Sequence, residues 1–322
     1  MKSTEIDSGH RAPLQELESL DELWFQVGGT LCNLSCNHCF ISCHPGNDNF
    51  GFLDLETIRR YLRESRELGV KEYYFTGGEP FLNRDMLRVL EETLAIGPAT
   101  VLTNGTVFTP SSIKALQAIS GESLYSLELR VSIDGYSPET NDPIRGEGTF
   151  EKALAGVKML VEAGFLPIIT MAQTWPEEES NRVFETFVAT LREAGYRRPR
   201  IKILPTLHLG MEAERSRPYS QAERISEEMM EGYDSSQLLC SRSRTVTDRG
   251  VAVCPLLIET PGAHLGESLQ EASGPTKDFS DRKTDHLRSR LLGDLLCRPI
   301  EGSHQTPWRD RQEAGVQVLD NP

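Results

Sequence analysis

The 322-residue sequence has no apolar run long enough to cross a membrane, and its first residues lack the hydrophobic core of a signal peptide. It is also poor in positive charge, since 34 lysines and arginines face 48 acidic residues and leave a net charge of -14. Nucleic-acid backbones and anionic membranes both require a basic face. We therefore expect a cytoplasmic protein with neither nucleic acid nor membrane as its partner.

A disulfide framework is also not indicated. The chain has seven cysteines, an odd number, and four of them lie between Cys32 and Cys43. Such a cluster in a chain without secretory features suits metal ligation in a reducing compartment better than disulfide bonding. Hydrophobic residues at 38% and charged residues at 25% are ordinary for a globular protein.

Three of these cysteines form a compact loop, Cys32-Asn33-Leu34-Ser35-Cys36-Asn37-His38-Cys39. The loop follows an apolar run, Leu23 to Val27, that reads as a buried strand, so it lies where α/β folds place their chemistry. Three thiolates at this spacing can hold three corners of an iron–sulfur cube and leave the fourth iron open to a substrate. A structural zinc site would normally require a fourth nearby ligand. The loop alone leaves both uses open.

Strand and helix signals alternate after the loop. Asp54 is positioned to cap a helix that Gly69 ends, Asn83 to cap another that stops at Gly97, and Pro110 to open a third. Further helices are predicted over 149–164 and from Trp175-Pro176 onward, and strands over 72–75, 100–103, 128–133, 167–171 and 200–204. Units of this length imply parallel pairing with right-handed crossovers. We expect an α/β fold, a partial (β/α)6 TIM-type barrel with a small irregular C-terminal extension.

The pattern divides the chain into four parts: an N-terminal lead-in over 1–21, the barrel core over 22–209, an extension over 210–274, and a poorly patterned tail over 275–322. The extension is predicted to contain a helix over 220–232 and a hairpin from Cys240 to Pro255, with Asp248-Arg249-Gly250 as its turn. The tail is about one-third charged and has the composition of a disordered segment. A shifted reading frame or a truncation is an alternative origin for it.

At this point the sequence resembles the radical S-adenosylmethionine (radical SAM) superfamily over about 23–209. The resemblance rests on the cysteine loop and on three further motifs, each placed after a predicted strand: Gly77-Gly78-Glu79-Pro80, Thr103-Asn104-Gly105 and Ser132-Ile133-Asp134-Gly135. One departure is His38, because the family often has an aromatic residue before the third cysteine. An imidazole can still pack against adenine.

The resemblance implies two cofactors, a [4Fe-4S] cluster on Cys32, Cys36 and Cys39 and S-adenosylmethionine on its open iron, with Cys43 outside the cluster. Reductive cleavage would yield a 5′-deoxyadenosyl radical that takes hydrogen from the substrate. The residues implied for S-adenosylmethionine binding are Gly77, Gly78, Glu79, Asn104, Ser132, Asp134 and Arg145. On its own, each of these is equally consistent with a turn, a cap or an exposed loop residue.

The hairpin resembles the start of the SPASM or twitch extension, which helps to bind an auxiliary iron–sulfur cluster. Here only Cys240, Cys254 and the distant Cys297 are available, too few for a full cluster without outside ligands. The alternative is that Cys240 and Cys254 are small buried residues. This resemblance favours a peptide, protein or cofactor precursor as substrate, with a small molecule as the next alternative. The expected electron donor is a protein such as flavodoxin or ferredoxin. A non-enzymatic iron–sulfur or zinc protein is the competing function.

Overall fold

The computed structural model describes residues 17–220, 223, 228–260, 262–273 and 317–318. Its framework is one open sheet in the order β10-β6-β5-β4-β3-β2-β1-β7-β8-β9. The six strands of the barrel core, all parallel, are β1 (Glu22–Gln26), β2 (Glu72–Thr76), β3 (Ala99–Thr103), β4 (Leu127–Ser132), β5 (Ile168–Ala172) and β6 (Arg200–Leu204). Beyond them lie β7 (Ser243–Thr247), β8 (Gly250–Ala252), β9 (His264–Gly266) and β10 (Gln317–Val318). The expected partial barrel is confirmed.

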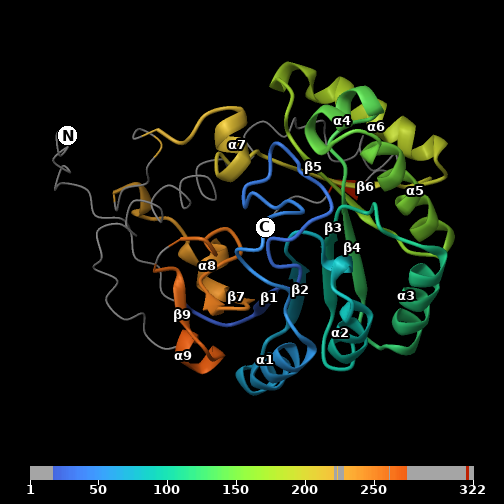
Figure 1. The fold of residues 1–322 in the computed structure, drawn as a ribbon. Helices are drawn as coiled ribbons and strands as arrows, with labels where there is room; N and C mark the ends of the chain where they lie inside the picture. Colours follow the sequence, from blue (N-terminus) through green and yellow to red (C-terminus); the bar gives the residue numbers. More distant parts are fainter. Residues whose placement is uncertain (1–16, 221–222, 224–227, 261, 274–316, 319–322) are drawn as a thin grey trace.

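Five helices between successive core strands cover the outer face of the sheet (Figure 1): α1 (Leu55–Leu68), α2 (Met86–Thr93), α3 (Pro110–Glu122), α5 (Thr149–Glu162) and α6 (Ser180–Glu193). The short helices α4 (Pro138–Arg145) and α7 (Gly210–Arg215) lie beside the cysteine loop. In the extension, α8 (Leu239–Arg242) precedes β7 and α9 (Leu269–Ser273) follows β9. Alternate strand residues such as Phe25, Val101 and Ile201 are buried in one hydrophobic core with helix residues such as Val157 and Phe187. The opposite, concave face of the sheet carries polar, charged and aromatic side chains.

Local chemistry explains where most helices begin and end. The Asp54 side chain accepts a hydrogen bond from Thr57 N at the start of α1, and Gly69 ends the helix in the left-handed conformation. Asp85 directly precedes α2 but makes no side-chain cap hydrogen bond. Asn83 Oδ1 accepts from Asp85 N at 3.0 Å, so Asn83 caps the turn that leads into the helix. Its amide also donates to the carbonyl oxygens of Val27 and Leu53, so one side chain combines a local cap with a tertiary bridge.

The hairpin expected in the extension is present, with Thr247 paired to Gly250 across its turn. Its first strand, β7, pairs in parallel with β1, so the extension continues the sheet of the barrel core. The helix expected over 220–232 lies partly outside the described residues, and the described part contains a 3-10 turn over Glu228–Met230. The tail from residue 275 also lies outside them, except for β10, which pairs with β6.

Candidate active site at the carboxyl ends of the strands

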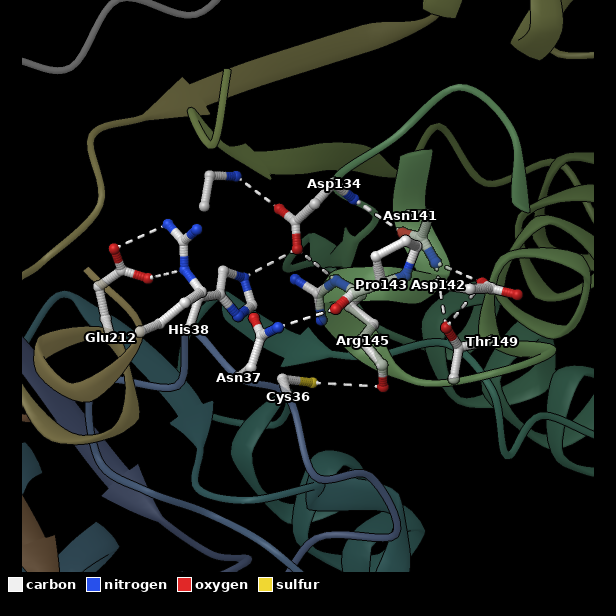
Figure 2. Close-up of polar contacts among 12 residues, drawn as sticks. Cys36, Asn37, His38, Asp134, Asn141, Asp142, Pro143, Arg145, Thr149 and Glu212 are labelled. Atoms are coloured by element: carbon white, nitrogen blue, oxygen red, sulfur yellow. Dashed lines mark hydrogen bonds and ion pairs between the residues drawn. The ribbon is translucent and has the colours of Figure 1, made fainter. Parts of the chain in front are cut away.

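The cysteine loop follows β1 and crosses the carboxyl ends of the neighbouring strands. Its middle is attached to the last turn of α4, where Asn37 N donates to Ile144 O at 2.9 Å and Asn37 Nδ2 donates to Pro143 O at 2.8 Å. Cys36 Sγ lies 3.9 Å from Arg145 O in the same turn (Figure 2). Main-chain carbonyls at the end of a helix are otherwise unpaired, so α4 supplies ready acceptors for this loop.

The three thiols lie within electrostatic reach of one another. The pKa of Cys32 is raised to about 12, mainly by burial and in smaller part by the nearby Glu79, Cys36 and Cys39. Burial also raises the pKa of Cys36, although Arg145 acts in the opposite direction. Metal binding requires thiolates, so a positively charged inorganic group would relieve the mutual repulsion of three ionised sulfurs at this place.

Cys39 differs from its two neighbours because it receives hydrogen bonds from Cys43. Cys43 N donates to Cys39 Sγ at 3.2 Å, and the Cys43 thiol is a second donor. The thiol bond is the main reason that the pKa of Cys39 falls to about 6, while the pKa of Cys43 is raised. Cys43 itself is 5% exposed and packs with Cys32, Ile41 and Phe50.

A buried charge cluster connects the loop to β4 and α4. His38 Nε2 lies 2.8 Å from Asp134 Oδ2, and Arg145 Nε lies 2.5 Å from the same oxygen, as an ion pair without the alignment of a hydrogen bond (Figure 2). Ala172 N donates to Asp134 Oδ1 at 2.6 Å. Burial opposes ionisation of Asp134, but Arg145 and His38 outweigh it and hold its pKa below the usual range. Both carboxylate oxygens of Asp134 already contact protein groups, so S-adenosylmethionine would have to share these oxygens with them.

Glu79 connects the second and third motifs. Its carboxylate is fully buried and accepts hydrogen bonds from Phe81 N at 3.0 Å, Thr103 Oγ1 at 2.8 Å and Asn104 N at 2.7 Å. Burial raises the pKa of Glu79 to about 7 in spite of these donors. The Asn104 amide in turn lies 3.7 Å from Cys32 Sγ and donates to Asn33 Oδ1 at 2.9 Å. Three motifs are thus joined through Asn104.

Gly77 and Gly78 are packed against the base of the cysteine loop. A Cβ on Gly78 would collide with the Leu31 carbonyl, and Gly77 has a φ of +134°, with Gly28 N 2.7 Å from where its Cβ would be. Gly78 N also donates to Gly29 O at 2.9 Å. The space that a side chain on either glycine would fill is therefore occupied by the protein's own backbone. Their contact with S-adenosylmethionine stays a prediction.

An open cavity of about 370 Å³ borders the loop on the side of α4 and α5. It is lined by Asn33, Leu34, Ser35, Thr106, Arg145, Gly146, Glu147, Thr149 and Lys152. Arg145 thus contacts Asp134 with Nε and also borders this space. Ser132 is the last residue of β4 and lies two positions before Asp134.

The donor set fits a cluster better than one metal ion. Within the ranges described, no three histidine, cysteine or acidic side chains converge where a single ion could bind. A cube of iron and sulfide spaces its cysteines more widely than one ion does, and three cysteines on one flexible loop suit that spacing. The same ranges contain no helix that is long and apolar enough to span a membrane.

The two described cysteines of the extension lie apart from this site. Cys254 is buried beside Leu257 and Ala263, and its pKa is raised to about 12, mainly by burial and in smaller part by the nearby Cys240. Cys240 is half-buried and packs near Leu238 and Met230. Cys297 lies outside the described residues. An auxiliary cluster at Cys240 and Cys254 stays a prediction.

Comparison with known proteins identifies the family. The radical SAM superfamily model matches residues 27–187, half of the chain, so this protein belongs to that superfamily. An AdoMet-dependent heme synthase of Methanosarcina barkeri is 33% identical over 48% of this chain and 43% of its own length. A GTP 3′,8-cyclase of Actinobacillus succinogenes is 26% identical over 55% and 52%, and mycofactocin maturase MftC of Mycobacterium tuberculosis is 29% identical over 50% and 41%. The chain spans about half the length of such relatives.

Solved structures share the fold at low sequence identity. Streptococcus suis SuiB bound to its precursor peptide SuiA matches 87% of this chain and 71% of its own with a TM-score of 0.60 and 15% identity. The AdoMet- and peptide-bound anSMEcpe matches 84% and 82% with a TM-score of 0.54 and 16% identity. Both matches cover a larger share of the chain than the family domain does.

Proposed function

We propose that this protein is a radical SAM enzyme that cleaves S-adenosylmethionine reductively and abstracts hydrogen from a peptide, protein or cofactor precursor. Membership of the superfamily implies S-adenosylmethionine and a [4Fe-4S] cluster as cofactors. The observation that carries the proposal is the convergence of four motifs at one sheet edge. Cys32 meets Asn104, Asn104 meets Glu79, and His38 meets Asp134.

Cys32, Cys36 and Cys39 would hold the cluster, and Gly77, Gly78, Glu79, Asn104, Ser132, Asp134 and Arg145 would surround S-adenosylmethionine. The cluster, when bound, would supply the one electron that splits S-adenosylmethionine into methionine and a 5′-deoxyadenosyl radical, and that radical would take hydrogen from the substrate. The chain's own residues have positioning tasks. Asn37, His38 and Arg145 fix the loop against α4 and β4, and the buried Glu79 fixes β2 against β3.

A peptide substrate is supported by two structures that share the fold over most of this chain, since SuiB and anSMEcpe were each solved with a peptide. The names of the heme synthase and mycofactocin maturase favour cofactor synthesis instead. A flavodoxin or ferredoxin is the proposed electron donor.

The decisive experiment is anaerobic reconstitution with iron and sulfide, reduction with dithionite, incubation with S-adenosylmethionine and chromatography for 5′-deoxyadenosine. We expect 5′-deoxyadenosine from the wild type and none from a Cys32→Ala/Cys36→Ala/Cys39→Ala variant. A colourless zinc-binding protein, or S-adenosylhomocysteine in place of 5′-deoxyadenosine, would refute the proposal.

A further inference from the structure

The side-chain amide of Asn104 contacts the sulfur of the first cysteine in the loop. Asn104 follows β3, and its Nδ2 donates to Cys32 Sγ at 3.7 Å. Asn104 is 7% exposed and Cys32 is 8% exposed, so water is largely excluded from this contact. A second donor to the same sulfur, Leu34 N at 3.4 Å, belongs to the cysteine loop itself. Asn104 is thus a donor that a core strand brings to the loop.

A closed cycle of three hydrogen bonds includes this amide. Asn104 Nδ2 donates to Asn33 Oδ1 at 2.9 Å, and Asn33 Nδ2 donates to Thr106 Oγ1 at 2.9 Å. Thr106 Oγ1 closes the cycle by donating to Asn104 Oδ1 at 2.7 Å. Each group in the cycle donates once and accepts once, so the three bonds are mutually consistent.

The cycle fixes which end of the Asn104 amide faces the sulfur. Thr106 N also donates to Asn104 Oδ1, at 2.9 Å, and a main-chain N–H can only donate. Asn104 Oδ1 must therefore face Thr106, and the NH2 group must face the cysteine loop. One amide proton is used by Asn33, so the other is left for Cys32 Sγ. Protein groups thus use the full hydrogen-bonding capacity of this side chain.

The main chain of Asn104 is also held in place. Asn104 N donates to Glu79 Oε2 at 2.7 Å, and the side chain of Glu79 is buried. The other carboxylate oxygen accepts from Thr103 Oγ1 at 2.8 Å. The position of the amide opposite Cys32 is therefore set by the ends of β2 and β3 and not by the cysteine loop alone.

Hydrogen bonds to cysteine sulfurs are among the factors that set the reduction potential of an iron–sulfur cluster. Reduction adds one negative charge, so a donor to a ligand sulfur stabilises the reduced form more than the oxidised form. The difference is larger where water is excluded, because a low dielectric strengthens the interaction. The buried contact between Asn104 and Cys32 meets this condition.

We propose, on the basis of the proposed function, that Asn104 is a positioning residue that raises the reduction potential of the cluster by donating to Cys32 Sγ. Asn33 and Thr106 hold the amide in the orientation that this requires. A higher potential makes the cluster easier to reduce. The amide therefore helps to determine which electron donors are strong enough to supply the protein.

The test measures the midpoint potential of the full-length reconstituted protein without S-adenosylmethionine, by redox titration followed by electron paramagnetic resonance. Asn104→Leu removes the donor and keeps a similar side-chain size. We expect it to lower the equilibrium constant for reduction about tenfold, a shift of about −59 mV for one electron. Thr106→Val is the matched control, because it breaks the same cycle while Thr106 N still fixes the Asn104 amide. Its equilibrium constant should stay within about threefold of wild type.

A second variant covers the case in which Asn104→Leu does not assemble a cluster. Asn104→Asp keeps an oxygen that accepts from Thr106 and replaces the NH2 group by a second oxygen, so its equilibrium constant for reduction should fall at least as far. Iron and sulfide analysis shows whether each variant carries the cluster. Loss of the cluster from both Asn104 variants would assign the residue to cluster assembly and overturn the inference.

Equal potentials in the wild type and the Asn104 variants, or an equal fall in Thr106→Val, would also overturn it. The same wild-type sample is assayed for 5′-deoxyadenosine. An active wild type whose potential is unchanged by the Asn104 substitutions refutes this inference alone. A wild type that carries the cluster but forms no 5′-deoxyadenosine refutes the proposed function, while the potentials still decide the inference. A wild type that binds no cluster refutes both.

Discussion

The hydrogen bonds of Cys43 indicate that it supports a ligand of the proposed cluster and is not itself a ligand. Its thiol and its backbone N–H both donate to Cys39 Sγ, so its position is that of a donor beside a ligand. Such bonds orient a ligand and tune the bound metal. The three-cysteine reading of the loop gives Cys43 this role and leaves one iron open.

We therefore predict that Cys43→Ala retains about four irons and four sulfides per reconstituted chain, because three thiolates still bind the cluster. Cys39→Ala, the matched variant, is expected to lose most of both. Colorimetric iron and sulfide analysis with the absorption spectrum checks this. Equal losses in the two variants would mean that Cys43 is itself a ligand.

The charge of Lys202 lowers the stability of the folded protein. Its pKa of about 8 lies below the ordinary 10.5, so folding disfavours its charged form. Below pH 8 the lysine is charged in both the folded and unfolded states and the cost is fully present; above about pH 10.5 it is neutral in both and the cost disappears. Wild-type stability should therefore rise, relative to a variant without this charge, between these two pH values.

Lys202→Met is accordingly predicted to raise the free energy of unfolding by about 1 to 2 kcal/mol near pH 7, a value discounted because the ammonium is only partly buried. Near pH 10.5 the difference should be close to zero. Urea unfolding of both proteins at the two pH values measures it. A difference that does not change with pH would assign the effect to packing.

At the scale of elements, the turn after β2 packs closely against the backbone at the base of the cysteine loop, which leaves no room for a side chain on Gly78. A methyl group on Gly78 would overlap the Leu31 carbonyl at the base of the cysteine loop. Because the atoms that overlap all belong to the backbone, no side-chain rotation can relieve the overlap, and the loop must shift.

Gly78→Ala is predicted to destabilise the protein by about 3 kcal/mol or more and to reduce iron content, because the displaced loop carries Cys32. The control is Gly121→Ala in α3, where a Cβ would meet nothing within 4 Å and alanine is expected to stabilise by about 0.5 to 1 kcal/mol. Thermal or urea unfolding and iron analysis compare the pair. Similar stability in both variants would contradict the proposed overlap.

Elements with strong local signals could be predicted from the sequence. Asp54 and Gly69 mark the two ends of α1, and β6 covers the expected residues 200–204. The helix α4 was missed because its residues lack an apolar period, although Ser137 and Pro138 at its start were readable signals. The place of β7 beside β1 could not be read, because residue alternation does not specify which strand is the neighbour.

The site shows the same division. Because each of the four motifs follows a predicted strand, the sequence places all four at one edge of the sheet, and the structure brings them together there. The contact between His38 and Asp134 was not predicted, because it joins a loop to a strand nearly 100 residues away. The contact of the Asn104 amide with Cys32 likewise joins residues 72 positions apart, so no local pattern specifies it.

At the scale of the whole molecule, the extension is joined to the core at several places. Besides the pairing of β7 with β1, the carbonyl of Glu267 accepts from Arg60 at 2.7 Å and from Tyr61 at 2.8 Å. Leu269 N also donates to Glu64 Oε2 on α1 at 2.8 Å. The contacts of Glu267 and Leu269 would be lost if the two parts separated. Within the extension, the side chain of Arg244 on β7 is 2% exposed, and its Nε donates to Ala272 O at 3.0 Å.

We predict that the core and the extension unfold as one cooperative unit, so a probe of each part should give the same urea midpoint. Circular dichroism reports mainly the core helices α1 to α6, and hydrogen-exchange protection of the hairpin of β7 and β8 reports the extension. Two separated midpoints would show that the extension folds on its own. Arg244→Met serves as the matched probe and is expected to lower both midpoints together.

The residues around the cysteine loop come from distant parts of the chain. Gly51 N, just after the loop, donates to Asp248 at 2.8 Å, Arg249 stacks 4.4 Å above Phe50, and Met211 N donates to Cys39 O. During synthesis, the thiols emerge from the ribosome about 200 residues before these partners. Iron insertion should therefore wait until translation has passed the hairpin, and ribosome-bound chains stalled before residue 240 should take up little iron.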